Sequence, residues 1–175
     1  DPNAGGRTAQ VAKLSSSTGA TVWSAGTIDG AKPGGLALTP TGSVVLAGSS
    51  IVGLSINEFA AANGARLTRT AYAEAAGYYA PGMAIGPQGQ IAVTGRSAGG
   101  LFVALESASR QPVFTTTAVA GGQGKAVAID GTGSVVVAGT VAASTGTDWA
   151  LLRLDGAGVA LHGTVVVDRH PTAAE

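Results

Sequence analysis

The chain has 175 residues, of which 45% are hydrophobic and only 11% are charged, and its ten basic side chains balance ten acidic ones. This length fits one domain with a buried core, and a neutral chain without a basic cluster excludes an electrostatic footprint for nucleic acid. No apolar run approaches the roughly 18 residues of a membrane-spanning helix, and the absence of cysteine excludes a disulfide framework and a thiolate metal site.

The first predicted elements are two short strands that no hairpin precedes. Residues 10–14 (QVAKL) and 21–26 (TVWSAG) are separated by the polar turn SSSTG. Apolar segments of this length on either side of a turn predict an antiparallel strand pair.

A phrase of fourteen residues then occurs three times, at residues 35–48, 82–95 and 126–139. Each copy is a short apolar strand, a turn and a second apolar strand, with glycine at the eighth and last positions. These glycines are Gly42, Gly89 and Gly133 in the turns, and Gly48, Gly95 and Gly139 at the ends. Because a turn glycine adopts positive φ without strain, the phrase predicts a β-hairpin. The copies begin roughly 45 residues apart, a period typical of propellers and solenoids.

A second strand pair follows each hairpin. The predicted pairs are 52–59 with 65–72, 101–107 with 112–119, and 149–154 with 159–167. Each unit then has four short antiparallel strands, which matches the blade of a β-propeller. The first strand of each hairpin centres on an alanine, and small side chains suit strands that crowd round a common axis. These alanines are Ala37, Ala84 and Ala128.

The sequence therefore predicts an all-β chain of β-propeller blades, each of four antiparallel strands, with about three and a half blades present. A parallel β-helix is the architectural alternative, but it does not need two hairpins in every period. The expected units are an extension at 1–8, an outer strand pair with a linker at 9–34, blades at 35–81, 82–125 and 126–168, and a linker at 169–175.

An incomplete ring leaves unpaired strand edges that need a cover. Because propellers close with about four to eight blades, we expect this chain to be part of a larger or partner-completed propeller. The expected partners are further blades of the same polypeptide or neighbouring chains. Two copies of the chain would not complement each other, since both supply the outer strand pair and neither supplies the missing hairpin. The rival expectation is a small open sheet that closes by oligomerising.

The segment AVAIDGTGSVVVAGT…DWALLRLDGAG resembles the bacterial seven-bladed-propeller repeats called SBBP repeats and the related delta-60 repeats. The resemblance covers residues 9–168 and implies a fold family with many extracellular and cell-envelope members and mostly no assigned chemistry. Separately, KLSSSTGATVW resembles the Thr-Gly-x-x-x-Trp docking motif of quinoprotein-like propellers. That resemblance implies that Trp23 wedges against the neighbouring blade, with Leu67, Phe114 and Leu161 in its place in the later units.

Motifs for catalysis and metal binding are not found in the sequence. His162 and His170 have no glutamate at a metalloprotease spacing, and no Gly-x-Ser-x-Gly elbow is present. The DGTG stretch at 130–133 is interpreted as a turn rather than a calcium loop. We therefore expect no catalytic residue, no metal and no cofactor, and we assign Glu58 and Glu106 to positions near the outer turns.

In a propeller, the loops between blades and those between the second and third strands emerge on one face. The candidate binding residues on that face are two adjacent tyrosines, which offer a stacking platform for a sugar or peptide, and three charged side chains. They are Tyr78, Tyr79, Arg96, Glu74 and Asp148. The alternative for the tyrosines is that one packs between blades while the other is exposed to solvent.

These features favour a non-catalytic propeller module of a secreted or cell-surface bacterial-type protein that acts as a scaffold or recognises a protein or glycan. Two alternatives stay open: a structural subunit of a surface filament or adhesin, and a propeller enzyme whose site is completed by blades outside these residues. The expected location is extracellular, at the cell surface or periplasmic.

Overall fold

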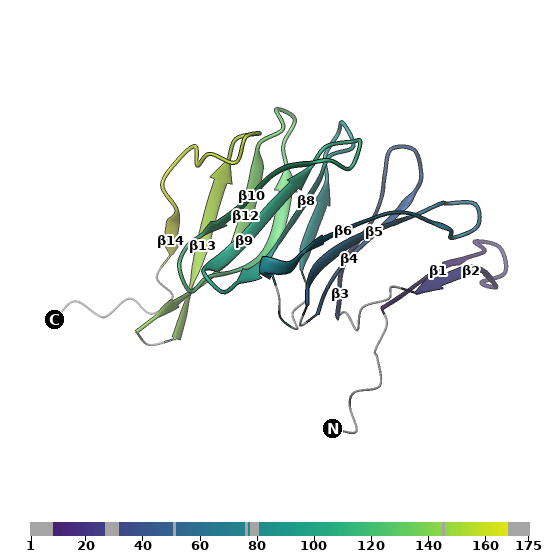
Figure 1. The fold of residues 1–175 in the computed structure, drawn as a ribbon, viewed down its shortest axis with the longest axis horizontal. Helices are drawn as coiled ribbons and strands as arrows, with labels where there is room; N and C mark the ends of the chain where they lie inside the picture. Colours follow the sequence, from purple (N-terminus) through teal and green to yellow (C-terminus); the bar gives the residue numbers. More distant parts are fainter. Residues whose placement is uncertain are drawn as a thin grey trace, which may run out of the picture.

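The computed structural model of the chain describes residues 9–26, 32–50, 52–75, 77, 81–144 and 146–167. Over these ranges the protein is all-β, with fourteen strands and a single 3-10 turn, η1 (Ala73–Ala75). Figure 1 shows the strands side by side in the order of the chain. All strand pairs are antiparallel. Nothing helical in the described ranges has the length and apolar character needed to cross a membrane.

The strands form four sheets that follow the order of the chain. The first sheet contains only β1 (Gln10–Leu14) and β2 (Thr21–Gly26). The second, third and fourth sheets have four sequential strands each. Their bounds are β3 (Lys32–Leu38), β4 (Val44–Ser50), β5 (Gly53–Phe59) and β6 (Arg66–Tyr72); β7 (Gly82–Ile85), β8 (Ile91–Ser97), β9 (Gly100–Glu106) and β10 (Pro112–Ala118); and β11 (Gln123–Ile129), β12 (Val135–Ala143), β13 (Gly146–Leu154) and β14 (Val165–Val167).

The three hairpins predicted from the repeated phrase are confirmed as β3–β4, β7–β8 and β11–β12. Their turn glycines Gly42, Gly89 and Gly133 have φ values of +86°, +84° and +84°. Residues with a Cβ adopt this region at a cost, which explains glycine at the eighth position of every copy. The prediction of an all-β chain built from four-stranded antiparallel sheets is therefore confirmed.

One predicted strand is much shorter in the structure. Residues 159–167 were expected to be extended, but β14 spans only Val165–Val167, and Ala160 makes an isolated bridge to Leu154. Strand residues gain stability mainly from packing against neighbours. The exposed face of this last sheet has no sheet against it in the described residues. The N–H of Leu161 still donates to the carbonyl oxygen of Arg153 in β13, but little holds residues 162–164 in a ladder.

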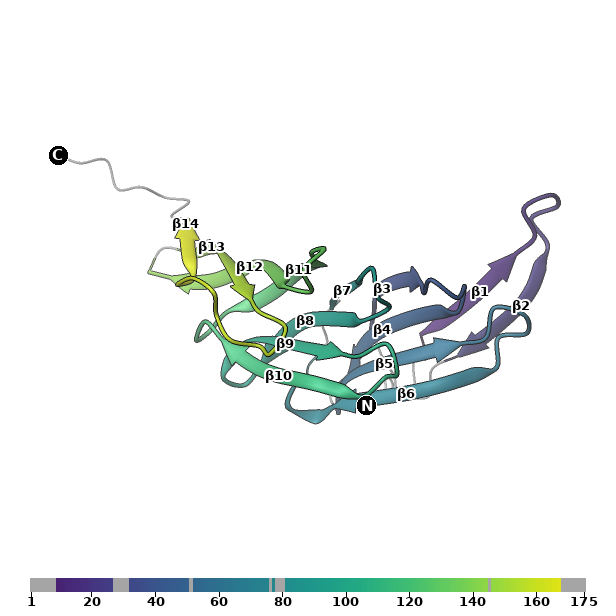
Figure 2. The same ribbon diagram turned by 90° about the horizontal axis from the view of Figure 1, so that it is seen from above.

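Successive sheets pack face to face, and their first strands lie along the same side of the row. Figure 2 shows β3, β7 and β11 on that side, with β6 and β10 on the other, and contacts join β3 to β7 and β7 to β11. The approach is close at Gly82 in β7, because a Cβ there would lie 2.7 Å from the carbonyl oxygen of Lys125 in β11. Contacts this short are not found for real Cβ atoms, so the position requires glycine.

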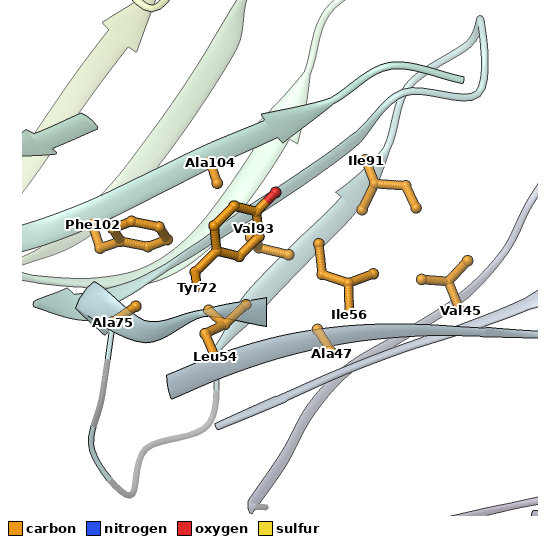
Figure 3. Close-up of a cluster of buried hydrophobic side chains, with 10 residues drawn as sticks. All are labelled: Val45, Ala47, Leu54, Ile56, Tyr72, Ala75, Ile91, Val93, Phe102 and Ala104. Atoms are coloured by element: carbon orange, nitrogen blue, oxygen red, sulfur yellow. The ribbon is translucent and has the colours of Figure 1, made fainter. Parts of the chain in front are cut away.

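The main core lies between the second and third sheets. Side chains from β4, β5 and β6 meet side chains from β8 and β9, as Figure 3 shows. Fully burying a large aliphatic or aromatic side chain contributes about 1.5–3 kcal/mol to stability, so this layer holds the two sheets together. Its members are Val45, Ala47, Leu54, Ile56, Tyr72, Ala75, Ile91, Val93, Phe102 and Ala104.

Equivalent layers lie on either side of this core. Leu101, Val103 and Leu105 of the third sheet pack on Val137 and Leu152 of the fourth. The layer between the first and second sheets is smaller because the first sheet has only two strands. It contains Ala9, Val11, Trp23, Val44, Leu46 and Phe59.

Candidate functional site

The charged residues predicted to bind a partner lie along one edge of the row of sheets. Glu74 is exposed on η1, directly after β6, and Arg96 is exposed near the end of β8. Asp148 is partly buried near the start of β13, where it pairs with Val141 across the hairpin. Because η1 lies against β8, Glu74 and Arg96 come from neighbouring elements, whereas Asp148 belongs to the next sheet. Tyr78 and Tyr79 lie outside the described residues.

The glycines at the ends of the repeated phrase, Gly48, Gly95 and Gly139, are all buried. A Cβ at Gly139 would collide with the carbonyl oxygen of Gln123 on the neighbouring strand. At this position the sheet leaves no room for a side chain. These glycines therefore shape the hairpins and offer no functional group.

Trp23 of β2 lies between the first and second sheets and is only 8% exposed. Its indole Nε1 donates a hydrogen bond of 3.0 Å to the carbonyl oxygen of Ala61, in the turn between β5 and β6. The ring also lies against Gly64, where a Cβ would stand 2.6 Å from Trp23 Cε3. An aromatic ring on one sheet thus packs on a turn glycine of the next.

The same contact recurs between the third and fourth sheets. Phe114 of β10 packs against Gly158, where a Cβ would lie 2.7 Å from the Phe114 ring. Strand pairing identifies the residue of the second sheet that is equivalent to Trp23 and Phe114. Trp23 pairs with Lys13 and Phe114 pairs with Leu105, and at the same position of the second sheet Thr68 pairs with Glu58. This corrects one expectation, because the residue in place of the aromatic ring is Thr68, not Leu67.

Leu67 occupies the position of a β-bulge. The ladder of β5 and β6 shifts register between Glu58 and Phe59, which leaves Leu67 unpaired and 55% exposed. The corresponding bulge residues of the first and third sheets are Val22 and Val113, and both are exposed. Because the same bulge occurs in all three sheets, the spacing of four residues from Gly19 to Trp23 selects Thr68 after Gly64 and not Leu67.

The second sheet has the small Thr68 in place of the aromatic ring, and the large side chain at this interface is Arg110 of the third sheet. Arg110, in the turn between β9 and β10, forms a two-point ion pair with Glu58 of β5. The distances are 2.7 Å from Nε to Oε2 and 3.2 Å from Nη2 to Oε1, and the side chains are 11% and 9% exposed. The hydrogen bond from Arg110, more than any other contact, lowers the pKa of Glu58. Glu58 is therefore held as a carboxylate.

Arg110 takes up this position at a backbone cost. Its φ is +64°, and the equivalent turn positions of the neighbouring sheets are Gly64 and Gly158, with φ of +71° and +85°. A non-glycine residue in the left-handed region costs roughly 1–2 kcal/mol. Besides Glu58, the guanidinium donates to the carbonyl oxygens of Gly89 at 2.9 Å and Ala108 at 3.2 Å. These bonds offset the strain by fixing two turns of the third sheet to the second.

A second polar contact crosses the same interface deeper inside. The hydroxyl of Tyr72 in β6 donates to Oε1 of Glu106 in β9 at 3.1 Å, and both residues are buried. Burial raises the pKa of Glu106, and burial next to the Glu106 charge raises that of Tyr72. The other carboxyl oxygen, Oε2, has no hydrogen bond. Burial thus disfavours the charged form of Glu106, and the hydrogen bond that Tyr72 donates favours it in part.

We call Glu58, Thr68, Tyr72, Glu106 and Arg110 the polar cluster. Neither of the apolar grooves described below reaches its residues, and its side chains are directed at one another across the interface. Glu58 and Glu106 lie next to the outer turns, as expected from the sequence, but their burial between two sheets was not foreseen. Comparing the strand pairing of the three sheets would have indicated this burial, because Glu106 occupies the position at which the second and fourth sheets have Phe59 and Leu154. An acid in an apolar repeat position marks a buried polar contact.

The DGTG stretch is a turn, as interpreted from the sequence. Oδ1 of Asp130 accepts hydrogen bonds from the backbone N–H groups of Thr132 and Ser134 and from the Thr132 hydroxyl. The Thr132 hydroxyl is the main reason that the pKa of Asp130 is lowered. Oδ2 accepts a hydrogen bond of 2.6 Å from Arg153 of β13, so the carboxylate fixes the turn and ties it to that strand.

Two apolar grooves lie at the two ends of the row of sheets. One, of about 440 Å³, is lined by β1, β3, Gly42, Val44 and Ala61. The other, of about 460 Å³, lies on the outer face of the fourth sheet and is lined by Lys125, Ala138, Gly139, Thr140, Trp149, Ala150, Leu151 and Val167. Each is located where the regular succession of sheets is interrupted.

No protein-family model matches the chain, and no curated protein matches it. Among solved structures, it is similar to the crystal structure of a protein of unknown function from Bacteroides caccae, at 14% sequence identity and a TM-score of 0.59. The match covers 97% of this chain and 57% of the other, so the chain spans a little over half the length of that protein. At this identity the similarity supports the fold alone.

Proposed function

We propose that the chain is an arc of a β-propeller that works as a non-catalytic module for scaffolding or for recognising a protein or glycan. The observation that carries the proposal is the repeated packing of the sheets. Three successive four-stranded sheets meet face to face, and their first strands contact one another along one side. Sheets that converge on their first strands are the arrangement of propeller blades.

The resemblance of the repeated phrase to SBBP and delta-60 repeats supports the same proposal. Those repeats are widespread in extracellular and cell-envelope proteins, so secretion or display at the cell surface is the location that we propose with it. The similar protein from Bacteroides caccae is longer than the region that this chain covers, which is consistent with an arc that further blades extend.

Recognition would use the edge formed by the connections between sheets and the turns between second and third strands. Glu74 and Arg96 stand exposed there on neighbouring elements, while the polar cluster is enclosed between sheets. Charged groups at such an edge select a partner without affecting the core that supports them. The polar cluster, by contrast, is suited to fixing the second and third sheets together.

A glycan microarray probed with the labelled chain tests the recognition part of the proposal. The expected result is binding to a subset of glycans that Arg96→Ala or Glu74→Ala weakens at least fivefold. Arg66→Ala, an exposed arginine at the opposite edge, is the matched control and should bind like the unaltered chain. Equal effects of Arg96→Ala and Arg66→Ala would contradict the assignment of this edge.

A further inference from the structure

The groove beside β1 adjoins the first sheet, which has two strands in the described residues. In the second, third and fourth sheets, the third strand is paired on both of its edges, to the second and the fourth strand. By the order of the chain and by its packing, β1 is the third strand of the first sheet, yet among the described residues it pairs with β2 alone. One row of its backbone N–H and C=O groups is therefore open to a further strand.

The side chains facing this groove are also incompletely covered. Leu36 and Leu38 of β3 point toward the first sheet and are 62% and 66% exposed. Large apolar side chains in such a position, next to an open strand edge, mark a surface that another element covers.

The chain itself shows what covers the equivalent surface, and it does so twice. Met83 and Ile85, at the second and fourth positions of the next copy, pack against the cluster that contains Val45 and Ala47, which lie on the second hairpin strand of the preceding sheet. In the third copy the same two positions are occupied by Val127 and Ile129. These pack against the cluster that contains Ala92, again on the second hairpin strand of the preceding sheet.

From this comparison we infer that the groove is a docking site for a β-hairpin of the repeated fourteen-residue pattern, contributed by a further repeat unit. Its second strand adds antiparallel to the open edge of β1, as β4 does to β5, and completes a four-stranded first sheet. The inference rests on the propeller arc proposed above, and it adds the site, the occupant and the register.

The three hairpins of the described residues cannot fill the site, because each already completes its own sheet. The same reason disfavours a second copy of this chain. The occupant is also constrained in sequence: its eleventh and thirteenth residues face Leu36 and Leu38. In the three known copies these positions hold only small or β-branched side chains, namely Val45 and Ala47, Ala92 and Thr94, and Val136 and Ala138.

The test fuses a second copy of residues 32–53, which includes the turn that follows the hairpin, directly ahead of Ala9 in the full chain. Hydrogen exchange is then measured for the amides of β1, with β5 and β9 as internal references. We expect exchange in β1 to slow at least tenfold and the denaturation midpoint to rise. A fusion carrying Leu46→Pro in the added copy should lose both effects, because proline removes a ladder donor.

Two charge variants locate the added hairpin. The double change Leu36→Asp and Leu38→Asp in the original copy should abolish the protection of β1. Leu151→Asp, an exposed leucine on the outer face of the fourth sheet, is the matched control and should leave that protection unchanged. The unfused chain with synthetic peptide 35–50 added in excess should show the same pattern at reduced occupancy, since an isolated hairpin is only marginally stable in water.

Unchanged exchange in β1 of the fusion, with β5 and β9 still protected, would overturn the inference and would leave the arrangement of the other sheets unaffected. Protection of β1 in the unfused chain that grows with protein concentration, together with a dimer mass, would show a second copy as the occupant and would also overturn it. Conversely, the hairpin could dock while the sheets form a straight stack; that outcome would refute the propeller arc and not the docking site.

Discussion

The ion pair between Glu58 and Arg110 offers a sharp test of how neighbouring sheets are joined. At the interface between the third and fourth sheets, Leu105 takes the place of Glu58 and Gly158 takes the place of Arg110. Removing one partner of a buried ion pair costs about 3–5 kcal/mol. Side chains that are 9% and 11% exposed lie near the lower end of this range. Arg110→Ala should therefore lower the free energy of unfolding by about 2–3 kcal/mol, because it removes the pair and keeps the strained φ.

Arg110→Gly should cost about 1 kcal/mol less than Arg110→Ala, because glycine relieves the strain at a φ of +64°. Combining it with Glu58→Leu recreates the pair of residues at the next interface and leaves no buried charge. We expect the double variant to lie within about 1 kcal/mol of the unaltered chain, although each single change is destabilising. Urea denaturation followed by far-UV circular dichroism gives the four free energies of this cycle. A neutral Arg110→Gly, or strictly additive changes, would refute the reasoning.

Two further predictions concern the core and the first strands. Because burial raises the pKa of Glu106 above its ordinary 4.5, the folded state retains a proton that the unfolded state releases, and stability falls as the pH rises from about 4.5 toward the raised value. Glu106→Gln should remove this loss, so its gain over the unaltered chain in urea denaturation should grow with pH; a gain that does not depend on pH would contradict it. Gly82→Ala places a Cβ against the Lys125 carbonyl and should cost at least 1–3 kcal/mol, roughly the penalty for overpacking. Gly131→Ala meets nothing within 4 Å and should leave the thermal midpoint unchanged; similar losses for both variants would show that the first strands are not crowded.

The hairpins could be predicted from the sequence because their signals are local. Gly42, Gly89 and Gly133 are required by turns that each involve only a few residues, and such turns recur wherever the local pattern recurs. The grouping into four-stranded sheets also followed, since consecutive antiparallel strands joined by short turns have few alternative pairings.

The contacts between sheets could not be predicted from local pattern alone. At Leu67 the signal was present but was not used, since the four-residue spacing from Gly19 to Trp23 recurs from Gly64 to Thr68. Glu106 was expected near an outer turn, where it lies, but its burial depends on which sheet covers β9 and is not visible in the strand itself. Aligning the repeats strand by strand would have placed it opposite apolar equivalents and exposed the exception. The shortness of β14 likewise depends on what packs against the fourth sheet, and the sequence of the strand does not contain that information.

The central claim, that the sheets converge on their first strands, can be measured directly in this cysteine-free chain. Spin labels would be attached in pairs through Lys32→Cys with Lys125→Cys on β3 and β11, and through Ala71→Cys with Val166→Cys on β6 and β14. Double electron–electron resonance should give a clearly shorter distance for the first pair than for the second. Equal distances for the two pairs, as in a straight stack of sheets, would contradict the account.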